Sequence, residues 1–247
     1  MPRCLLVLLL LLCPWLAQAE EEVNVDEVYW QDQDWQQYGE AKQVGSQLTL
    51  WHKTNQGYRL GLALLLPDWQ QVSQLLPLSH ALNELGFDTL TMLPSPRQQD
   101  LDPGSEADQQ KVQEFRQLWA EQVKDLQKNA GDGSGQHLLV AQGSSAAWLA
   151  SLLAAQQLPA PDALLLLDAA YPAKDANAVM AREIAQLPVP VLDLYNSTPH
   201  PWRLDAAQAR QLEVRRSNKL DWRQQGYRQP SQWANQVKGW LHHLGWQ

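Results

Sequence analysis

Cysteine is almost absent from this sequence. Its two copies, Cys4 and Cys13, both fall within residues 1–19, a segment that we expect to be removed. The chain that remains would carry no thiol, so it could form no disulfide bond and no cysteine-ligated metal site. It is still long enough to bury a sizeable core, which makes one domain the simplest organisation.

Long apolar runs are missing beyond the start of the chain. Residues 5–12 form an unbroken apolar run, which Arg3 precedes and the Ala-Gln-Ala of residues 17–19 follows. This order is typical of a secretory signal peptide, here cut before Glu20. The run is well short of the roughly 20 apolar residues that cross a bilayer. We therefore expect a soluble periplasmic or secreted protein, with an uncleaved N-terminal anchor as the alternative.

Basic residues are in the minority. The sequence has 19 Lys and Arg against 27 Asp and Glu, which gives a formal net charge of −8. Such a charge repels nucleic acid and anionic membrane surfaces, and no cluster of basic residues offsets it. We expect no nucleic-acid partner, and no stable membrane insertion after signal cleavage.

Apolar strands alternate with helices over a single domain at residues 44–247, after an exposed lead-in at residues 20–43. We expect strands at residues 47–52, 58–66, 87–93, 137–141, 163–167, 189–195 and 220–227. We expect helices at residues 72–85, 112–126, 145–157, 174–186, 205–216 and 231–244. The first two strands would pair as an antiparallel hairpin. The alternation predicts an α/β domain with a doubly wound, mostly parallel sheet and helices on both faces.

The segment that follows the strand at residues 137–141 is the most informative one. It contains five small residues, Gly143-Ser144-Ser145-Ala146-Ala147, before a helix. The pattern small-x-nucleophile-x-small is that of a nucleophile elbow, in which a strained turn joins a strand to a helix. Gly143 and Ala147 fill the two small positions, which makes Ser145 the candidate nucleophile. The alternatives are a simple helix N-cap and an anion site on free backbone N–H groups.

The order of the elements and the elbow together resemble the α/β-hydrolase superfamily over nearly the whole chain beyond residue 20. More narrowly, the chain resembles a family of exported bacterial α/β-hydrolase-like proteins of uncharacterised function. The segments that carry this resemblance are residues 86–90, 142–145, 190–195 and 239–241. The resemblance implies the fold far better than it implies a reaction.

The resemblance also implies an oxyanion hole made by two backbone N–H groups. One belongs to the residue after the nucleophile, here Ala146. The other lies in the loop after the early buried strand, where Pro67 has no N–H, so that Asp68 or Trp69 would donate. A carboxylate at Asp68 would oppose a developing oxyanion, so we expect that side chain to face solvent or to cap the next helix.

Histidine is missing where this fold places its general base. The base follows the last strand, but residues 226–230 contain no histidine, and none occurs between His200 and His242. Losing the base costs several orders of magnitude in rate. His200 follows the strand at residues 189–195 and could reach Ser145 in a rearranged dyad, although a loop histidine between two prolines also fits a structural role.

Two aspartates end or occupy strands near the same edge of the sheet. Asp168 ends its strand and is the first choice for a catalytic acid, with a turn cap as the alternative. Asp193 lies inside a strand and is expected to be a satisfied structural carboxylate. No cofactor is expected, because no metal-ligand cluster is visible and the glycine-rich residues 131–135 precede a strand, whereas a dinucleotide loop follows one.

Two function hypotheses remain. The first is an esterase-like serine hydrolase that acts on a small ester substrate through Ser145, with His200 and Asp168 as base and acid. The second is a catalytically inactive hydrolase-fold scaffold that binds a small molecule or an envelope protein. The missing histidine favours the second, and the small residues around Ser145 favour the first.

Overall fold

The structure is a computed structural model, and it describes residues 39–45, 47–69, 71–98, 101, 105–129, 134–198 and 201–246. The strands are β1 Glu40–Val44, β2 Gln47–His52, β3 Gly61–Leu66, β4 Phe87–Met92, β5 Gln136–Gln142, β6 Ala163–Leu167, β7 Val191–Asn196 and β8 Trp222–Tyr227. The α-helices are α2 Val72–Glu84, α3 Gln109–Asn129, α4 Gly143–Ala154, α5 Lys174–Gln186, α6 Pro201–Ser217 and α7 Trp233–His243. The described residues also form short 3-10 turns, η2 Pro96–Gln98, η3 Glu106–Asp108 and η4 Pro230–Gln232.

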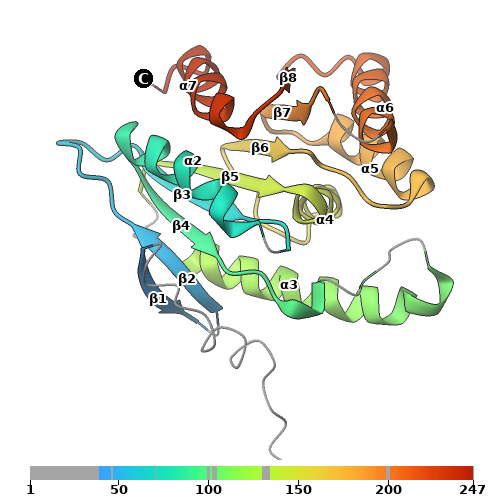
Figure 1. Cartoon of the computed structure of the whole chain (residues 1–247), viewed down its shortest axis with the longest axis horizontal. Coiled ribbons are helices and arrows are strands. Elements are labelled where there is room, and N and C mark those ends of the chain that lie inside the picture. The colour runs from blue at the N-terminus through green and yellow to red at the C-terminus, as the bar shows by residue number, and fades with distance from the viewer. Residues whose placement is uncertain are drawn as a thin grey trace, which may run out of the picture.

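The strands form one eight-stranded sheet in the order β1-β2-β4-β3-β5-β6-β7-β8 (Figure 1). Every neighbouring pair from β4 to β8 is parallel, and β2 is antiparallel to both β1 and β4. The central strands are apolar throughout because both of their faces are covered, as in β3 and β6, whose residues are all buried. The predicted doubly wound, mostly parallel sheet is confirmed.

The N-terminal antiparallel hairpin is also present, but it joins other strands than those predicted. β2 pairs with β1, through a turn at Gly45 with a φ of +60°, and not with residues 58–66. β3 instead lies between β4 and β5, parallel to both. The reason is burial, because a strand that is apolar on both faces belongs in the middle of the sheet. β1 thus adds residues 40–43, which we expected to belong to the lead-in, to the edge of the sheet.

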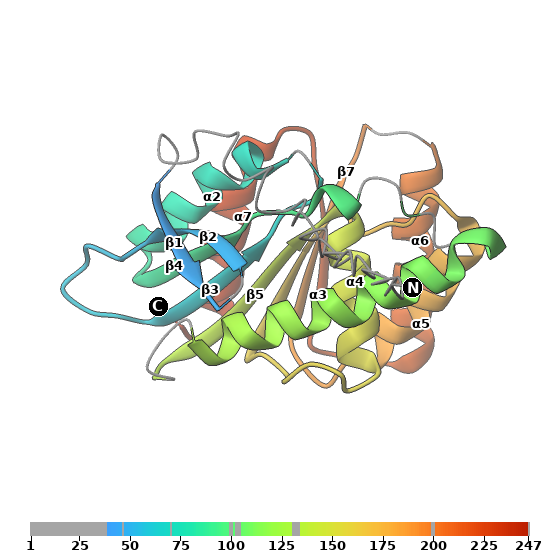
Figure 2. The ribbon, with the colours of Figure 1, turned by 90° about the horizontal axis from the view of Figure 1, so that it is seen from below.

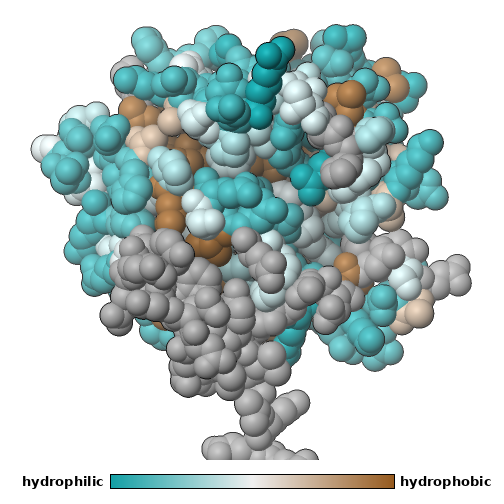
Figure 3. Space-filling view, in the orientation of Figure 1, coloured by the Kyte–Doolittle hydropathy of each residue, from teal (hydrophilic) through white to brown (hydrophobic). Residues whose placement is uncertain are grey.

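Helices cover the two faces of the sheet (Figure 2). On one face α3, α4 and α5 enclose a core to which they contribute Trp119, Leu149 and Ile184. On the other face α2 and α7 pack a second core with Leu82 and Trp240. None of the helices in the described ranges is long and apolar enough to cross a membrane. Hydrophilic side chains predominate on the face shown in Figure 3, where apolar side chains show only in separate small areas.

This topology fixes where a site can form. The six parallel strands end at one common edge, and in open α/β sheets ligands bind outside the carboxyl ends of the strands. β5 lies near the middle of that edge and passes directly into α4 (Figure 1). The segment that joins β5 to α4 therefore stands at the centre of the carboxyl edge.

Candidate functional site

The predicted strand–turn–helix arrangement is present at the end of β5. Gln142 is the N-cap of α4 and is extended, with φ −121° and ψ 142°. Gly143 comes next and has a φ of +57°, a left-handed conformation that favours glycine because other residues meet a steric cost there. The chain turns sharply at this residue and continues as a helix.

The strained residue of the turn is Gly143, and not Ser145 as predicted. Ser145 lies two residues inside α4, and its φ is not positive. With Gly143 at the tip, the residues two places before and after it are Ala141 and Ser145, which are both small. The predicted register of the elbow is therefore wrong by two residues. Ser145 takes the place of the small flanking residue, which must fit where the strand and the helix nearly touch.

Ser145 is buried and both of its hydrogen-bonding roles are filled. Ser145 is only 1% exposed. Its Oγ donates to the carbonyl of Pro67 at 2.8 Å and accepts from the Nε2 of Gln98 at 2.8 Å. A nucleophile must be reachable and have a base for its proton, and this hydroxyl has neither among the described residues. The catalytic role of Ser145 stays a prediction that this geometry does not favour.

Asp68 turns inward against the tip of the elbow. An ideal Cβ built on Gly143 would lie 1.9 Å from the Oδ2 of Asp68, so the carboxylate fills the space that a side chain at the tip would need. Asp68 does not cap the next helix, since the N-cap of α2 is Gln71 and has no side-chain cap bond, and it is only partly exposed to solvent. The N-terminus of α4 carries partial positive charge, and it attracts a carboxylate where glycine leaves room.

Ser144 is the partly exposed hydroxyl of the elbow. Its Oγ donates to the Oδ1 of Asp68 at 2.5 Å and accepts from the Nε2 of Gln98 at 2.9 Å. Gln98, in η2, thus bridges the two neighbouring serines. Ser144 directly follows the tip residue, which is where the elbow of this fold has its oxyanion donor.

Two of the three predicted oxyanion donors, the N–H groups of Ala146 and Trp69, are engaged in other bonds. Ala146 is the fourth residue of α4, and the N–H at that position of an α-helix is bonded to the carbonyl of the N-cap, here Gln142. The N–H of Trp69 donates to the Oδ1 of Asp68 at 3.0 Å. Ala147, predicted as the second small flank, is fully buried in the helix. The helix N–H groups that remain unpaired within α4 are those of its first three residues.

Asp168 joins the ends of three strands. It follows β6 with a φ of +52°, and its carboxylate accepts the N–H of Asn196 at 2.6 Å and the hydroxyl of Tyr227. Among the residues described, no hydrogen bond joins it to either serine of the elbow. The neighbouring Ala170 does reach the elbow, with its N–H 3.4 Å from the carbonyl of Gly143. Asp168 as a catalytic acid stays a prediction.

Burial raises the pKa of both Asp168 and Tyr227. Desolvation raises the pKa of Asp168, although the hydrogen bonds from Tyr227 and Asn196 act to lower it. Burial also raises the pKa of Tyr227, and the adjacent Asp168 carboxylate raises it further. Tyr227 ends β8, directly before the loop in which the fold places its histidine. His200, the predicted base, lies outside the described residues.

Comparison with known proteins identifies the family. Residues 94–243 match the family described as "Protein of unknown function (DUF3530)". The chain belongs to the DUF3530 family. The matched region of this DUF3530 protein includes the elbow, Gln98, Asp168 and Tyr227, but not Asp68. No curated protein matches the chain.

Solved structures show the fold of this DUF3530 protein. MGS-MChE2, an α/β hydrolase from the metagenome of sediments of the Mar Chica lagoon in Morocco, aligns with a TM-score of 0.59 and 11% identity, over 83% of this chain and 99% of that chain. The predicted CIB-like hydrolase of Thermoplasma acidophilum aligns at 0.58 and 10%, over 83% and 97%. Esterase 2 of Thermogutta terrifontis aligns at 0.59 and 6%, over 84% and 94%. The α/β-hydrolase fold is confirmed, and likeness at such identities extends to the fold alone.

Asp168 makes the stability of the DUF3530 protein depend on pH. Because the pKa of Asp168 is higher in the folded state than in the unfolded state, the folded protein binds the carboxyl proton more tightly. The stability that this proton contributes is present below pH 3.8, the ordinary pKa, and is lost as the pH rises through the raised pKa. Asp168→Asn, which keeps an acceptor and never ionises, is therefore expected to gain stability relative to the parent as the pH rises. Urea unfolding of both proteins over a pH series measures this difference, and a difference that stays constant or shrinks with rising pH would contradict it.

Proposed function

We propose that this DUF3530 protein is an exported hydrolase-fold protein that binds a small molecule at the carboxyl edge of its sheet without hydrolysing it by a serine route. The observation that carries this proposal is the tip of the elbow. Gly143 stands where the fold places its nucleophile, and the carboxylate of Asp68 fills the adjacent space. The signal-peptide pattern of residues 1–19 supports export to the periplasm or beyond.

Serine hydrolysis needs an attacking hydroxyl, a base that takes its proton and donors that stabilise the oxyanion. At this elbow the tip residue has no side chain, and the loop after β8 offers Arg228 and Gln229 in place of a histidine. The negative charge of Asp68 beside the tip would oppose an oxyanion, because like charges repel strongly in a poorly hydrated site. A ligand that donates hydrogen bonds or carries positive charge would instead be favoured there.

An esterase-like serine hydrolase is the second candidate function. The observation that favours it is the 2.5 Å bond from the Oγ of Ser144 to Asp68, since a carboxylate at that distance could accept the serine proton. In this version Ser144, partly exposed beside the tip, would attack the substrate. Ser145 with His200 and Asp168 is the other version, and it requires the buried hydroxyl to become accessible.

A fluorophosphonate probe separates these candidates. Such a reagent tests for an activated serine, and one neighbour of the fold, esterase 2 of Thermogutta terrifontis, is described as phosphoramylated by tabun. We expect no labelling of the DUF3530 protein at any pH at which it stays folded, while an active esterase labels in parallel. Mass spectrometry of the intact protein is the measurement.

Two single variants make the outcome specific. Labelling that disappears in Ser144→Ala and persists in Ser145→Ala would replace the binding proposal by the Ser144 hydrolase. The reverse result would establish the Ser145 version. Thermal unfolding of both variants shows that each is folded, so that a loss of labelling cannot be ascribed to loss of structure.

A further inference from the structure

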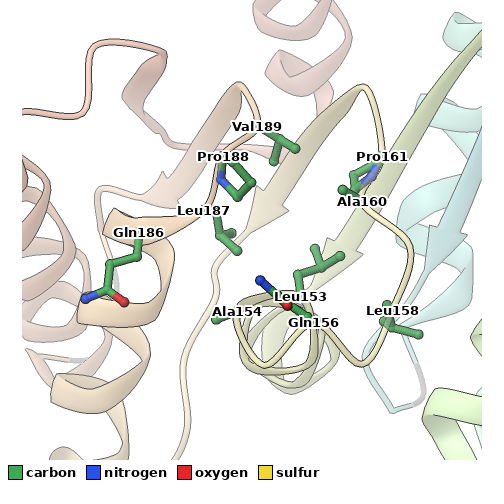
Figure 4. A pocket seen from close by; sticks show the side chains of 10 residues that line it. All are labelled: Leu153, Ala154, Gln156, Leu158, Ala160, Pro161, Gln186, Leu187, Pro188 and Val189. Atoms are coloured by element: carbon green, nitrogen blue, oxygen red, sulfur yellow. The ribbon is translucent and has the colours of Figure 1, made fainter.

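A cavity of about 610 Å³ opens at the edge of the sheet opposite the elbow. It lies between the C-terminal ends of α4 and α5 and the starts of β6 and β7 (Figure 4). Ten residues line it: Leu153, Ala154, Gln156, Leu158, Ala160, Pro161, Gln186, Leu187, Pro188 and Val189. Cavities that bind small molecules are commonly about 300–1,000 Å³ in volume, so this one is of suitable size.

The lining of the cavity carries no charged side chain, and polar and apolar atoms share its surface about equally. Leu153, Leu158, Leu187 and Val189 supply buried apolar side chains, and prolines and alanines complete the walls. A charged ligand would lose hydration here without gaining a partner of opposite charge, which is costly. A neutral molecule with an apolar part would instead remove apolar surface from water on both sides.

One amide at the rim supplies a polar contact. Gln156 follows α4 with a φ of +56°, the left-handed position that ends a helix and at which glycine is usual. The bonds from its N–H to Leu153 and from the next N–H to Leu152, at 3.0 and 2.9 Å, complete this helix end. Gln156 keeps a side chain although its backbone conformation is strained for any residue but glycine, which suggests that the side chain has a function.

The amide of Gln156 is available to a ligand. Its side chain has no hydrogen-bond partner within the described part of the chain, and its nitrogen points between Leu153 and Leu187 (Figure 4). The amide of Gln186, also at the rim, points away from the other lining side chains (Figure 4). Gln156 is thus the donor that a group seated in the cavity would meet.

One wall of the cavity is held in place from behind. The Nζ of Lys219 donates to the carbonyls of Leu187 at 2.6 Å and Val189 at 2.8 Å, and it pairs with Asp221 at 2.6 Å. The Lys219 side chain is only 5% exposed. A wall that is fixed before binding reduces the ordering cost that a ligand would otherwise meet.

We infer that this cavity binds a small neutral molecule that combines an apolar part with a carbonyl or hydroxyl oxygen, which accepts from the Gln156 amide. The site is separate from the elbow, because α4 begins at the carboxyl edge of the sheet and ends at the opposite one. Its occupancy therefore does not depend on what the elbow binds or on whether a serine reacts.

Nile red, a neutral apolar dye with a ring carbonyl, tests the inference by fluorescence titration of the full protein. We expect a saturable rise in fluorescence. Ala160→Trp fills the cavity from its lining and should weaken the affinity by at least about tenfold, since it removes the apolar burial on which binding depends. Ala155→Trp is the matched control, because Ala155 is an exposed alanine five residues away that does not line the cavity.

Gln156→Gly separates a ligand contact from a structural role, because it should change stability and dye affinity in opposite directions. It should raise the midpoint of thermal unfolding, because it relieves the left-handed strain, and yet weaken dye binding by about three- to tenfold through the lost hydrogen bond. Non-saturable binding, or equal affinity in the parent and Ala160→Trp, would overturn the inference. Dye binding that falls as the protein concentration rises would also overturn it, in favour of a second copy of the chain covering the cavity.

Discussion

Arg210→Met is expected to lower the free energy of unfolding by about 3–5 kcal/mol, because it leaves a carboxylate buried without its counter-ion. Arg210 and Asp193 are 1% and 0% exposed. The Nε and Nη2 of Arg210 donate to the two carboxylate oxygens of Asp193 at 2.7 and 2.9 Å, and its Nη1 donates to the carbonyl of Ala169. In the variant, the amide of Gln224, at 2.8 Å, would be the remaining side-chain partner of Asp193 among the described residues.

The control for this prediction is a pair on the surface. Arg216 is 64% exposed and contacts Glu213 at 2.6 Å, so Arg216→Met should change the stability by less than about 1 kcal/mol. The double variant Arg210→Met with Asp193→Leu removes both charges and should recover most of the loss. Equilibrium urea unfolding measures all three, and a single variant that loses less than about 1.5 kcal/mol would contradict the prediction.

This buried pair shows one kind of structure that the sequence could predict. Asp193 interrupts an apolar strand, so the pattern alone indicated a satisfied structural carboxylate. Its partner Arg210 lies in α6, seventeen residues further along the chain, and nothing in the helical pattern singled it out. Burial of a charge can thus be predicted from one strand, whereas the residue that neutralises it depends on packing between two elements.

The sheet itself was predictable because its central strands are apolar on both faces. β6 and α5 were predicted with their observed bounds, since an apolar run and an amphipathic pattern each require a particular burial. β1 was missed because its sequence, Glu-Ala-Lys-Gln-Val, is that of a mostly polar edge strand. The hairpin was assigned to the wrong strands for the same reason, as β2 then lacked its true partner.

The elbow shows where sequence patterns cease to be specific. Small residues at positions 141, 143, 145 and 147 allow the small-x-nucleophile-x-small pattern to be placed in two registers, centred on Gly143 or on Ser145. Backbone geometry selects between them, and the sequence did not. The contacts that define the site, from Asp68 to Ser144 and from Gln98 to both serines, join residues that are 76, 46 and 47 positions apart. Such contacts follow from the folded sheet and carry no local signal.

The elbow also carries the second large expected effect. Gly143→Ala should lower the free energy of unfolding by about 2–4 kcal/mol, because the left-handed φ of +57° costs a non-glycine residue roughly 1–2 kcal/mol and a crowded site adds a similar amount. The added Cβ would lie 1.9 Å from the Oδ2 and 2.5 Å from the Cγ of Asp68. Equilibrium urea unfolding measures the loss.

Gly239→Ala is the matched control, since a Cβ at that position in α7 meets nothing within 4 Å. It should stabilise the protein by about 0.5–1 kcal/mol, as expected for alanine in place of glycine inside a helix. The double variant Gly143→Ala with Asp68→Gly removes the collision, so that only the backbone cost remains. The loss of unfolding free energy in the double variant should therefore differ from the sum of the two single losses by about 1–3 kcal/mol. Additive effects would mean that Asp68 does not fill the space beside Gly143, and its carboxylate would then not exclude a nucleophilic side chain from the tip.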